Sequence, residues 1–183
     1  MKSKIQSIKE RVVSFFDPKG IEVEMLRYRP NKASYKMTLF GIVAFALAFA
    51  IHYSGTSISG SGGSFSFLGS TNLGFWNFFD ILLNILLLLF FLTSAMEMEA
   101  YSVRFGIAAI VGGAFQAIRP LLFVLAVFQS GNMSPAIFAI VTSLYIVSGV
   151  FIVVSGILAI IRGTKLRAYL KDVAPMQNER IGK

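Results

Sequence analysis

The residues best placed to do chemistry in this chain are polar side chains inside long apolar stretches. Asp80 and Arg119 are the only formal charges within four such stretches, and Asn84 and Gln116 each lie about one helical turn from one of them. A charged group in hydrocarbon costs about 2.5–3.5 kcal/mol on an insertion scale, so it normally faces a partner or a water-filled cavity. These four side chains are therefore the candidate intramembrane polar site.

Their spacing places the two charges at one depth. At a rise of 1.5 Å per residue, Asp80 lies roughly 10 Å inside its stretch and Arg119 roughly 13 Å inside the next. In antiparallel helices, Asp80 then faces Arg119 and Asn84 faces Gln116. We expect one polar seam between the two helices, and Pro120 is expected to kink the second of them because it lacks a backbone donor.

Three interpretations of this seam are open. It can be an ion pair and an amide pair that lock two helices, with no substrate, and we favour this interpretation. Alternatively, one of the charges completes an interface with a different membrane subunit. The third possibility is an ion or solute site for transport.

Other chemistry finds little support. The chain has no Cys and a single histidine, His52, which excludes disulfides, thiol nucleophiles and a zinc site built from several His or Cys ligands of one chain. Glu97 and Glu99 are two residues apart and do not share a helical face, and no HExxH or GxSxG pattern occurs. We expect no enzyme, no cofactor and no metal, and we interpret His52 as a solvated interfacial anchor.

The elements that must position the seam follow from composition. Hydrophobic residues make up 55% of the 183 residues and charged residues 14%, against about 25% charged in an average soluble domain. The apolar stretches approach the roughly 20 residues that cross a bilayer as a helix. We therefore expect an all-α integral membrane protein with four transmembrane helices in one domain, 37–161. The four stretches are 37–54, 73–95, 106–128 and 136–161.

The charges sort by side. Of 17 Lys and Arg residues, nine precede the first stretch and six follow the fourth, while the first and third connections carry no charge. The positive-inside rule then places both termini in the cytoplasm. The net charge of +8 thus reflects topology, and we expect no nucleic-acid partner. A bacterial plasma membrane is the simplest location, and the ends form an interfacial segment, 1–36, and a basic cytoplasmic tail, 162–183.

The N-terminal segment has the pattern of a membrane-surface element. Residues 4–16 place apolar side chains at helical spacing between basic ones, which predicts a basic amphipathic helix in the interface. Residues 21–25 alternate with period two and leave a strand or an extended linker open. Ordinary topogenic charge is our preferred interpretation; recognition of one lipid and docking of a cytoplasmic partner are the alternatives. The expected membrane-surface residues are Lys4, Lys9, Arg11, Arg27, Arg29, Lys32 and Lys36.

Small residues indicate close helix packing, but they leave its target open. Ala109 and Gly113 are four residues apart, and Gly149 and Gly156 are seven apart, so each pair can form a stripe of close approach. Such stripes can serve the four-helix core or another protomer. The expected partners are the lipid bilayer and either other membrane subunits or further copies of the chain. The expected function is an accessory or scaffolding subunit of a membrane assembly; the alternative is a small oligomeric transporter or channel.

Overall fold

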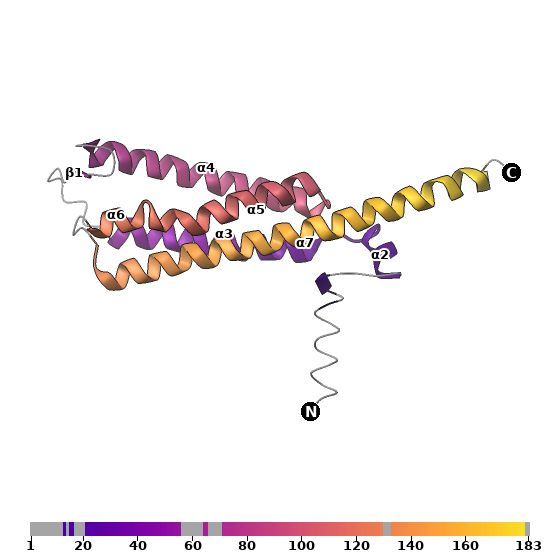
Figure 1. Ribbon diagram of the computed structural model, residues 1–183, viewed down its shortest axis with the longest axis horizontal. Helices are drawn as coiled ribbons and strands as arrows, with labels where there is room; N and C mark the ends of the chain where they lie inside the picture. The colour runs from indigo at the N-terminus through magenta and orange to yellow at the C-terminus, as the bar shows by residue number, and fades with distance from the viewer. Residues whose placement is uncertain are drawn as a thin grey trace, which may run out of the picture.

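The computed structural model describes residues 13, 15–16, 21–55, 64–65, 71–129 and 133–181 (Figure 1). The expected all-α architecture is confirmed for these residues, apart from two paired antiparallel strands of two residues each, β1 (Ser64–Phe65) and β2 (Thr71–Asn72). The helices, with one 3-10 turn, η1, are α2 (Ile21–Leu26), α3 (Lys32–Gly55), α4 (Leu73–Glu99), α5 (Val103–Ile118), η1 (Arg119–Leu121), α6 (Val124–Gln129) and α7 (Pro135–Ile181).

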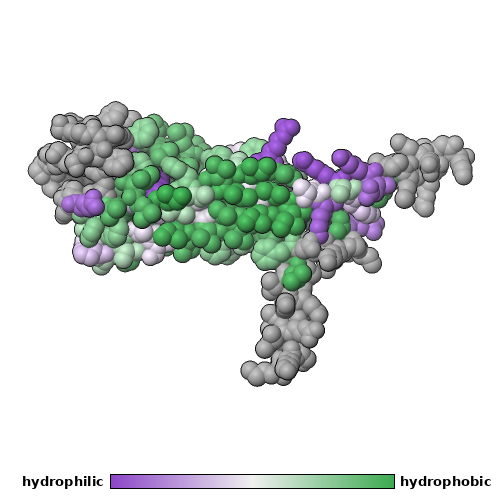
Figure 2. All heavy atoms as spheres, in the orientation of Figure 1, coloured by the Kyte–Doolittle hydropathy of each residue, from purple (hydrophilic) through white to green (hydrophobic). Residues whose placement is uncertain are grey.

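Three of the described helices are long and apolar enough to cross a membrane. The segments that meet this criterion are Lys32–Tyr53 in α3, Phe79–Glu99 in α4 and Pro135–Val173 in α7. Apolar side chains cover much of the visible side of the bundle, and hydrophilic ones gather at the end where α7 extends beyond it (Figure 2). The architecture is therefore compatible with a membrane protein.

The third expected stretch, 106–128, does not form one continuous helix. It is divided into α5, the 3-10 turn η1 and the six-residue α6, and none of these belongs to the three long apolar helices. The break begins at Arg119 and Pro120, where proline cannot donate to the preceding turn. The backbone carbonyl of Arg119 then accepts from the N–H groups of Leu122 and Phe123, at 2.9 and 3.0 Å, before α6 begins.

The segments that were expected to flank the bundle are partly helical. Helix α7 continues without interruption to Ile181, so no structural break separates the expected tail from the last apolar stretch. Residues 21–25 belong to the helix α2 instead of a strand or extended linker. Of the expected interfacial helix, only Val13, Phe15 and Phe16 are described, and all three are helical. Lys4, Lys9, Arg11 and most of the loop 55–72 lie outside the described residues.

Helix α7 forms the centre of the packing and runs antiparallel to both α3 and α5. A Cβ on Gly149 would lie 2.5 Å from the carbonyl oxygen of Gly113, and one on Gly156 would lie 2.5 Å from that of Gly106. The small-residue stripe of α7 therefore packs against α5 of the same chain. On its other side, Phe45 of α3 contacts Tyr145, with 5.9 Å between the ring centroids.

Candidate functional site

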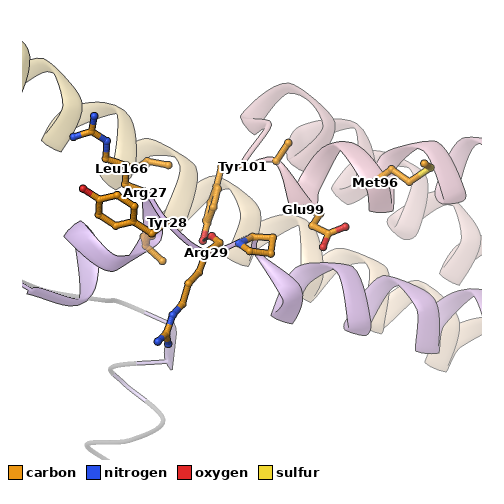
Figure 3. A pocket seen from close by; sticks show the side chains of 10 residues that line it. Arg27, Tyr28, Arg29, Met96, Glu99, Tyr101 and Leu166 are labelled. Atoms are coloured by element: carbon orange, nitrogen blue, oxygen red, sulfur yellow. Dashed lines mark hydrogen bonds between the residues drawn. The ribbon is translucent and has the colours of Figure 1, made fainter.

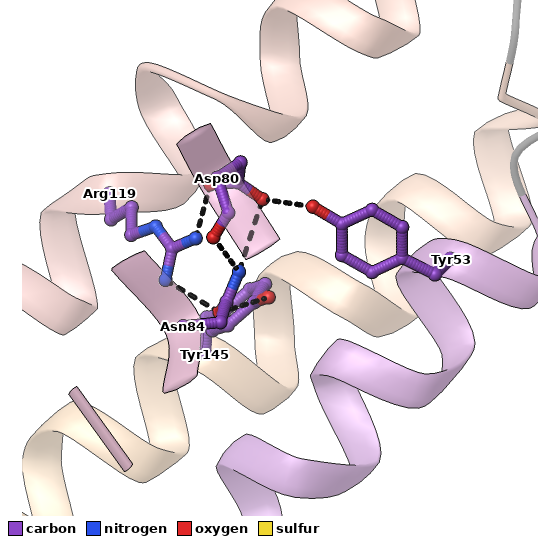
Figure 4. A network of polar contacts seen from close by, with 5 residues as sticks. All are labelled: Tyr53, Asp80, Asn84, Arg119 and Tyr145. Atoms are coloured by element: carbon purple, nitrogen blue, oxygen red, sulfur yellow. Dashed lines mark hydrogen bonds and ion pairs between the residues drawn. The ribbon is translucent and has the colours of Figure 1, made fainter. Parts of the chain in front are cut away.

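Four helical segments bring their polar side chains together inside the bundle. We call this group the Asp80–Arg119 cluster; its members are Tyr53 of α3, Asp80 and Asn84 of α4, Arg119 of η1 and Tyr145 of α7 (Figure 4). Asp80, Asn84 and Arg119 are at most 4% exposed. The cluster thus joins all three long helices to the broken segment, whereas the sequence predicted a seam between only two helices.

The Asp80 carboxylate accepts hydrogen bonds from three side chains. Arg119 Nη2 forms an ion pair with Oδ1, while the Tyr53 hydroxyl donates to Oδ2 at 2.6 Å and Asn84 Nδ2 donates to the same oxygen at 3.1 Å. Asn84 Nδ2 also lies 2.7 Å from the Asp80 backbone carbonyl, one turn earlier in the helix. A buried carboxylate needs this degree of satisfaction, because desolvation can otherwise exceed the Coulombic gain.

The Arg119 guanidinium is held on several sides. Its Nη1 donates to Asn84 Oδ1 at 2.7 Å, and the Tyr145 hydroxyl reaches the same oxygen in a longer contact of 3.5 Å. Its Cζ lies 5.5 Å from the centroid of the Tyr145 ring and 5.6 Å from that of Phe123. Arginine suits this position because its planar fork can bond two acceptors while its face lies against aromatic rings.

Gln116 does not occupy its expected place. The predicted Asn84–Gln116 pair is absent, because the Asn84 amide is engaged by Asp80 and Arg119. Gln116 is fully buried, and neither of its amide atoms has a hydrogen-bond partner among the described residues. The spacing of three residues predicted that Gln116 shares a helical face with Arg119. At this level α5 packs closely on α7, since a Cβ built on Gly149 would lie 2.8 Å from the Cβ of Ala117, the residue next to Gln116.

Sequence reasoning missed the two tyrosines of the cluster. Tyr53 lies near the end of α3 and Tyr145 one third of the way along the apolar part of α7, and neither is near Asp80 in the sequence. The depth arithmetic that paired Asp80 with Arg119 would have placed Tyr145, nine residues into its stretch, roughly 13 Å deep and so near the level of Arg119. Tyr53 is one residue from the end of its stretch, so the same arithmetic would have placed it roughly 9 Å shallower than Asp80. No periodic signal indicated the direction of either hydroxyl.

His52 also differs from the expectation. It is 4% exposed and stacks on Tyr53 with 4.9 Å between ring centroids, so it is a packed residue and not a solvated anchor. Within the part of the chain that the structure describes, no group of three or more His, Cys, Asp or Glu side chains is arranged to hold a metal ion.

A second polar group lies at the opposite end of the bundle. Asn31 donates from Nδ2 to Ser34 Oγ at 2.8 Å and accepts from Arg162 Nη1 at 3.0 Å. One turn further along α3, the Thr38 and Ser155 hydroxyls are 2.5 Å apart, and each also lies within 3.0 Å of the Ser34 carbonyl oxygen. These contacts attach the start of α3 to α7, and they contain no unpaired acid or nucleophile.

The expected surface residues that are described lie at this same end. Arg27, Arg29, Lys32 and Lys36 are all exposed. Two of them, Arg27 and Arg29, border an open groove of about 480 Å³ that also contains Leu26, Met96, Glu99 and Leu166 (Figure 3). We call it the Arg27–Arg29 groove; Lys32 and Lys36 do not line it.

The site thus consists of a buried, mutually satisfied ion pair at one end of an all-α bundle with three potential membrane-spanning helices. Such an arrangement can join helices strongly, because separating them would expose two charges to an apolar environment. Comparisons with protein-family models, with curated proteins and with solved structures find no match to this chain.

Proposed function

We propose that this chain is a non-enzymatic, multi-pass membrane protein that acts as an accessory or scaffolding subunit of a larger assembly. The observation that carries the proposal is the closed Asp80–Arg119 cluster. Its carboxylate is satisfied by Arg119, Tyr53 and Asn84, so it presents no free acid for catalysis. A polar group whose partners all lie within the chain is suited to positioning helices, and rigid helices are what a scaffold requires.

We propose further that the chain crosses the membrane four times, with α5, η1 and α6 as one interrupted crossing. The support is the antiparallel packing. Gly106 and Gly113 of α5 meet Gly156 and Gly149 of α7, while Arg119 at the end of α5 meets Asp80 at the start of α4. The chain therefore reverses direction after α4 and again before α7. With the basic residues at the two chain ends, both termini are proposed to be cytoplasmic, in a plasma membrane.

Cysteine labelling should resolve this topology, since the chain has no native cysteine. Single variants Ser134→Cys and Lys171→Cys mark exposed positions near the start of α7 and in its extension. We expect a membrane-impermeant thiol reagent to modify Ser134→Cys in intact cells, and Lys171→Cys only after permeabilisation. The cysteine-free parent controls for background, and labelling of both variants in intact cells would contradict the four-crossing arrangement.

The assembly itself is tested by the mass of the native complex. After mild-detergent extraction from its own membrane, we expect the full chain to migrate with a second polypeptide in fixed stoichiometry, measured by native mass spectrometry. Arg104→Gln, which removes an exposed arginine of α5, should retain that partner. Recovery of the chain alone at its monomer mass would contradict the subunit role.

One observation favours a transporter or channel as the second candidate. The helix break at Arg119 and Pro120 lies one turn from the buried, unpartnered Gln116 amide, and discontinuous helices form solute sites in many transporters. This alternative requires a homo-oligomer that conducts when reconstituted in liposomes. Loss of that conductance in Asp80→Asn would support it, whereas a stoichiometric second polypeptide without conductance would support the scaffold.

A further inference from the structure

The Arg27–Arg29 groove lies where the apolar surface of the bundle ends. Met96 and Glu99 lie in the last turn of the apolar segment of α4. The potential span of α3 begins at Lys32, and the groove residues 26–30 come just before it in the chain. The volume of about 480 Å³ falls within the range of small-ligand sites. In a membrane, this position corresponds to the level of the lipid headgroups.

The lining combines two kinds of chemistry. Leu26, Met96 and Leu166 supply apolar surface, and Figure 3 shows Arg27 and Arg29 extending to opposite sides. Glu99 is the one carboxylate among the lining residues, so the two arginines leave an excess of positive charge. The groove is therefore matched to an anionic ligand with an apolar portion.

The groove is also held in shape before any ligand arrives. Tyr101 adopts a φ of 61°, a left-handed conformation that is rare for a tyrosine, and its hydroxyl donates to the Arg29 carbonyl at 2.9 Å. The Asn31 N–H donates to the Glu99 carbonyl at 2.9 Å. Burial raises the pKa of Tyr101, although the charge of Arg162 opposes this, so the hydroxyl keeps its proton and remains a donor.

An exposed apolar path leads away from the groove along α4. Leu89, Leu92 and Met96 occur at spacings of three and four residues and thus share one helical face. They are 56%, 37% and 68% exposed, respectively. A soluble anion or an acidic peptide would gain nothing from contact with this apolar surface, whereas an acyl chain attached to an anionic headgroup would pack along it.

We propose that the Arg27–Arg29 groove binds the headgroup of an anionic phospholipid, whose acyl chain lies along the Met96 face of α4. The side chains of Arg27 and Arg29 are exposed and extend to opposite sides without a ligand, so they turn toward the bound headgroup and donate to its phosphate oxygens in charge-assisted contacts. This site is distinct from the Asp80–Arg119 cluster, and its occupancy does not depend on whether that cluster serves a scaffold or a transporter.

Lipid retention by the purified full chain tests the proposal. The protein is incubated in detergent with equal amounts of phosphatidylglycerol and phosphatidylcholine, and bound lipid is measured by native mass spectrometry. We expect preferential retention of phosphatidylglycerol, and a loss of about 30-fold in Arg27→Gln/Arg29→Gln, since each basic contact contributes about a factor of five. The matched control Lys32→Gln/Lys36→Gln removes the same charge outside the groove and should change retention by less than about threefold.

Several outcomes would overturn the proposal. Equal retention of both lipids by the unaltered protein would contradict it. An equal loss of lipid retention in the two double variants would also contradict it. Binding of inorganic phosphate with no retention of lipid would show that the groove is a simple anion site. Met96→Gln tests the acyl-chain part of the proposal separately. It leaves both arginines in place and should weaken lipid retention without affecting any binding of inorganic phosphate.

Discussion

Replacement of Arg119 by glutamine should destabilise the folded protein by about 3 kcal/mol or more, because it leaves the buried Asp80 carboxylate without its counter-charge. Glutamine can still donate a hydrogen bond, but it cannot bond Asp80 and Asn84 together as the guanidinium fork does. Unfolding of the purified chain in mixed micelles, followed by circular dichroism over a denaturing-detergent titration, measures the effect.

Arg104→Gln is the matched control for this prediction. Arg104 lies in the first turn of α5, the helix that leads into η1, and is exposed, so its removal should change stability by less than about 0.5 kcal/mol. If Arg119→Gln is as stable as Arg104→Gln, the cluster does not lock the bundle. The function proposed above would then lose the observation that carries it.

Combined substitutions distinguish a specific Asp80–Arg119 pair from a general requirement for polar side chains at the two positions. Asp80→Asn/Arg119→Gln should be more stable than either single variant, since no bare charge remains inside the bundle. Exchange of the two residues, Asp80→Arg/Arg119→Asp, should restore stability only in part. The reason is that Tyr53 and Asn84 donate to the side chain at position 80, which suits a carboxylate and not a guanidinium.

Gly149→Ala should destabilise the bundle by about 1–2 kcal/mol by separating α7 from α5. Its added methyl would lie 2.5 Å from the Gly113 carbonyl oxygen and 2.8 Å from the Ala117 backbone nitrogen. Backbone atoms can yield only if a whole helix moves, and overpacking of this kind costs about 1–3 kcal/mol, against up to about 1 kcal/mol gained in helix propensity. The same detergent titration gives the measurement.

Gly112→Ala is the control for this second prediction. Its Cβ would lie 2.7 Å from a ring atom of Phe90 and 3.0 Å from one of Phe91, similarly short contacts, but both are with side chains and not with backbone. We therefore expect a change within about 1 kcal/mol of the parent. If Gly112→Ala and Gly149→Ala lose the same stability, backbone contact between α5 and α7 is not what makes Gly149 necessary.

Much of the architecture was predictable from local pattern. Stretches of apolar residues near the length of a bilayer anticipated the three long helices, since length and hydropathy are properties of a segment alone. The level of Asp80 and Arg119 followed from the rise per residue, and their side chains do meet. Charge sorting also assigned a side to each chain end, and that assignment stays a prediction.

The break in the third stretch was only half anticipated. Pro120 indicated a kink, and the chain instead forms a 3-10 turn and a separate short helix. The missing N–H of proline is visible in the sequence. Whether the freed backbone groups bend one helix or begin another depends on the surrounding helices, and Arg119 is held here by residues of α4 and α7.

By itself, the sequence determined which stretches are apolar, three of which form long helices, where their charges lie along them, and that Asp80 and Arg119 share a level. Only the tertiary structure decided that Tyr53 and Tyr145 complete the cluster, that Gln116 is buried apart from Asn84, and that Gly149 packs within its own chain. The physical reason is that periodicity orients side chains relative to their own helix axis. The rotation of each helix against its neighbours is set by the packing of all of them together.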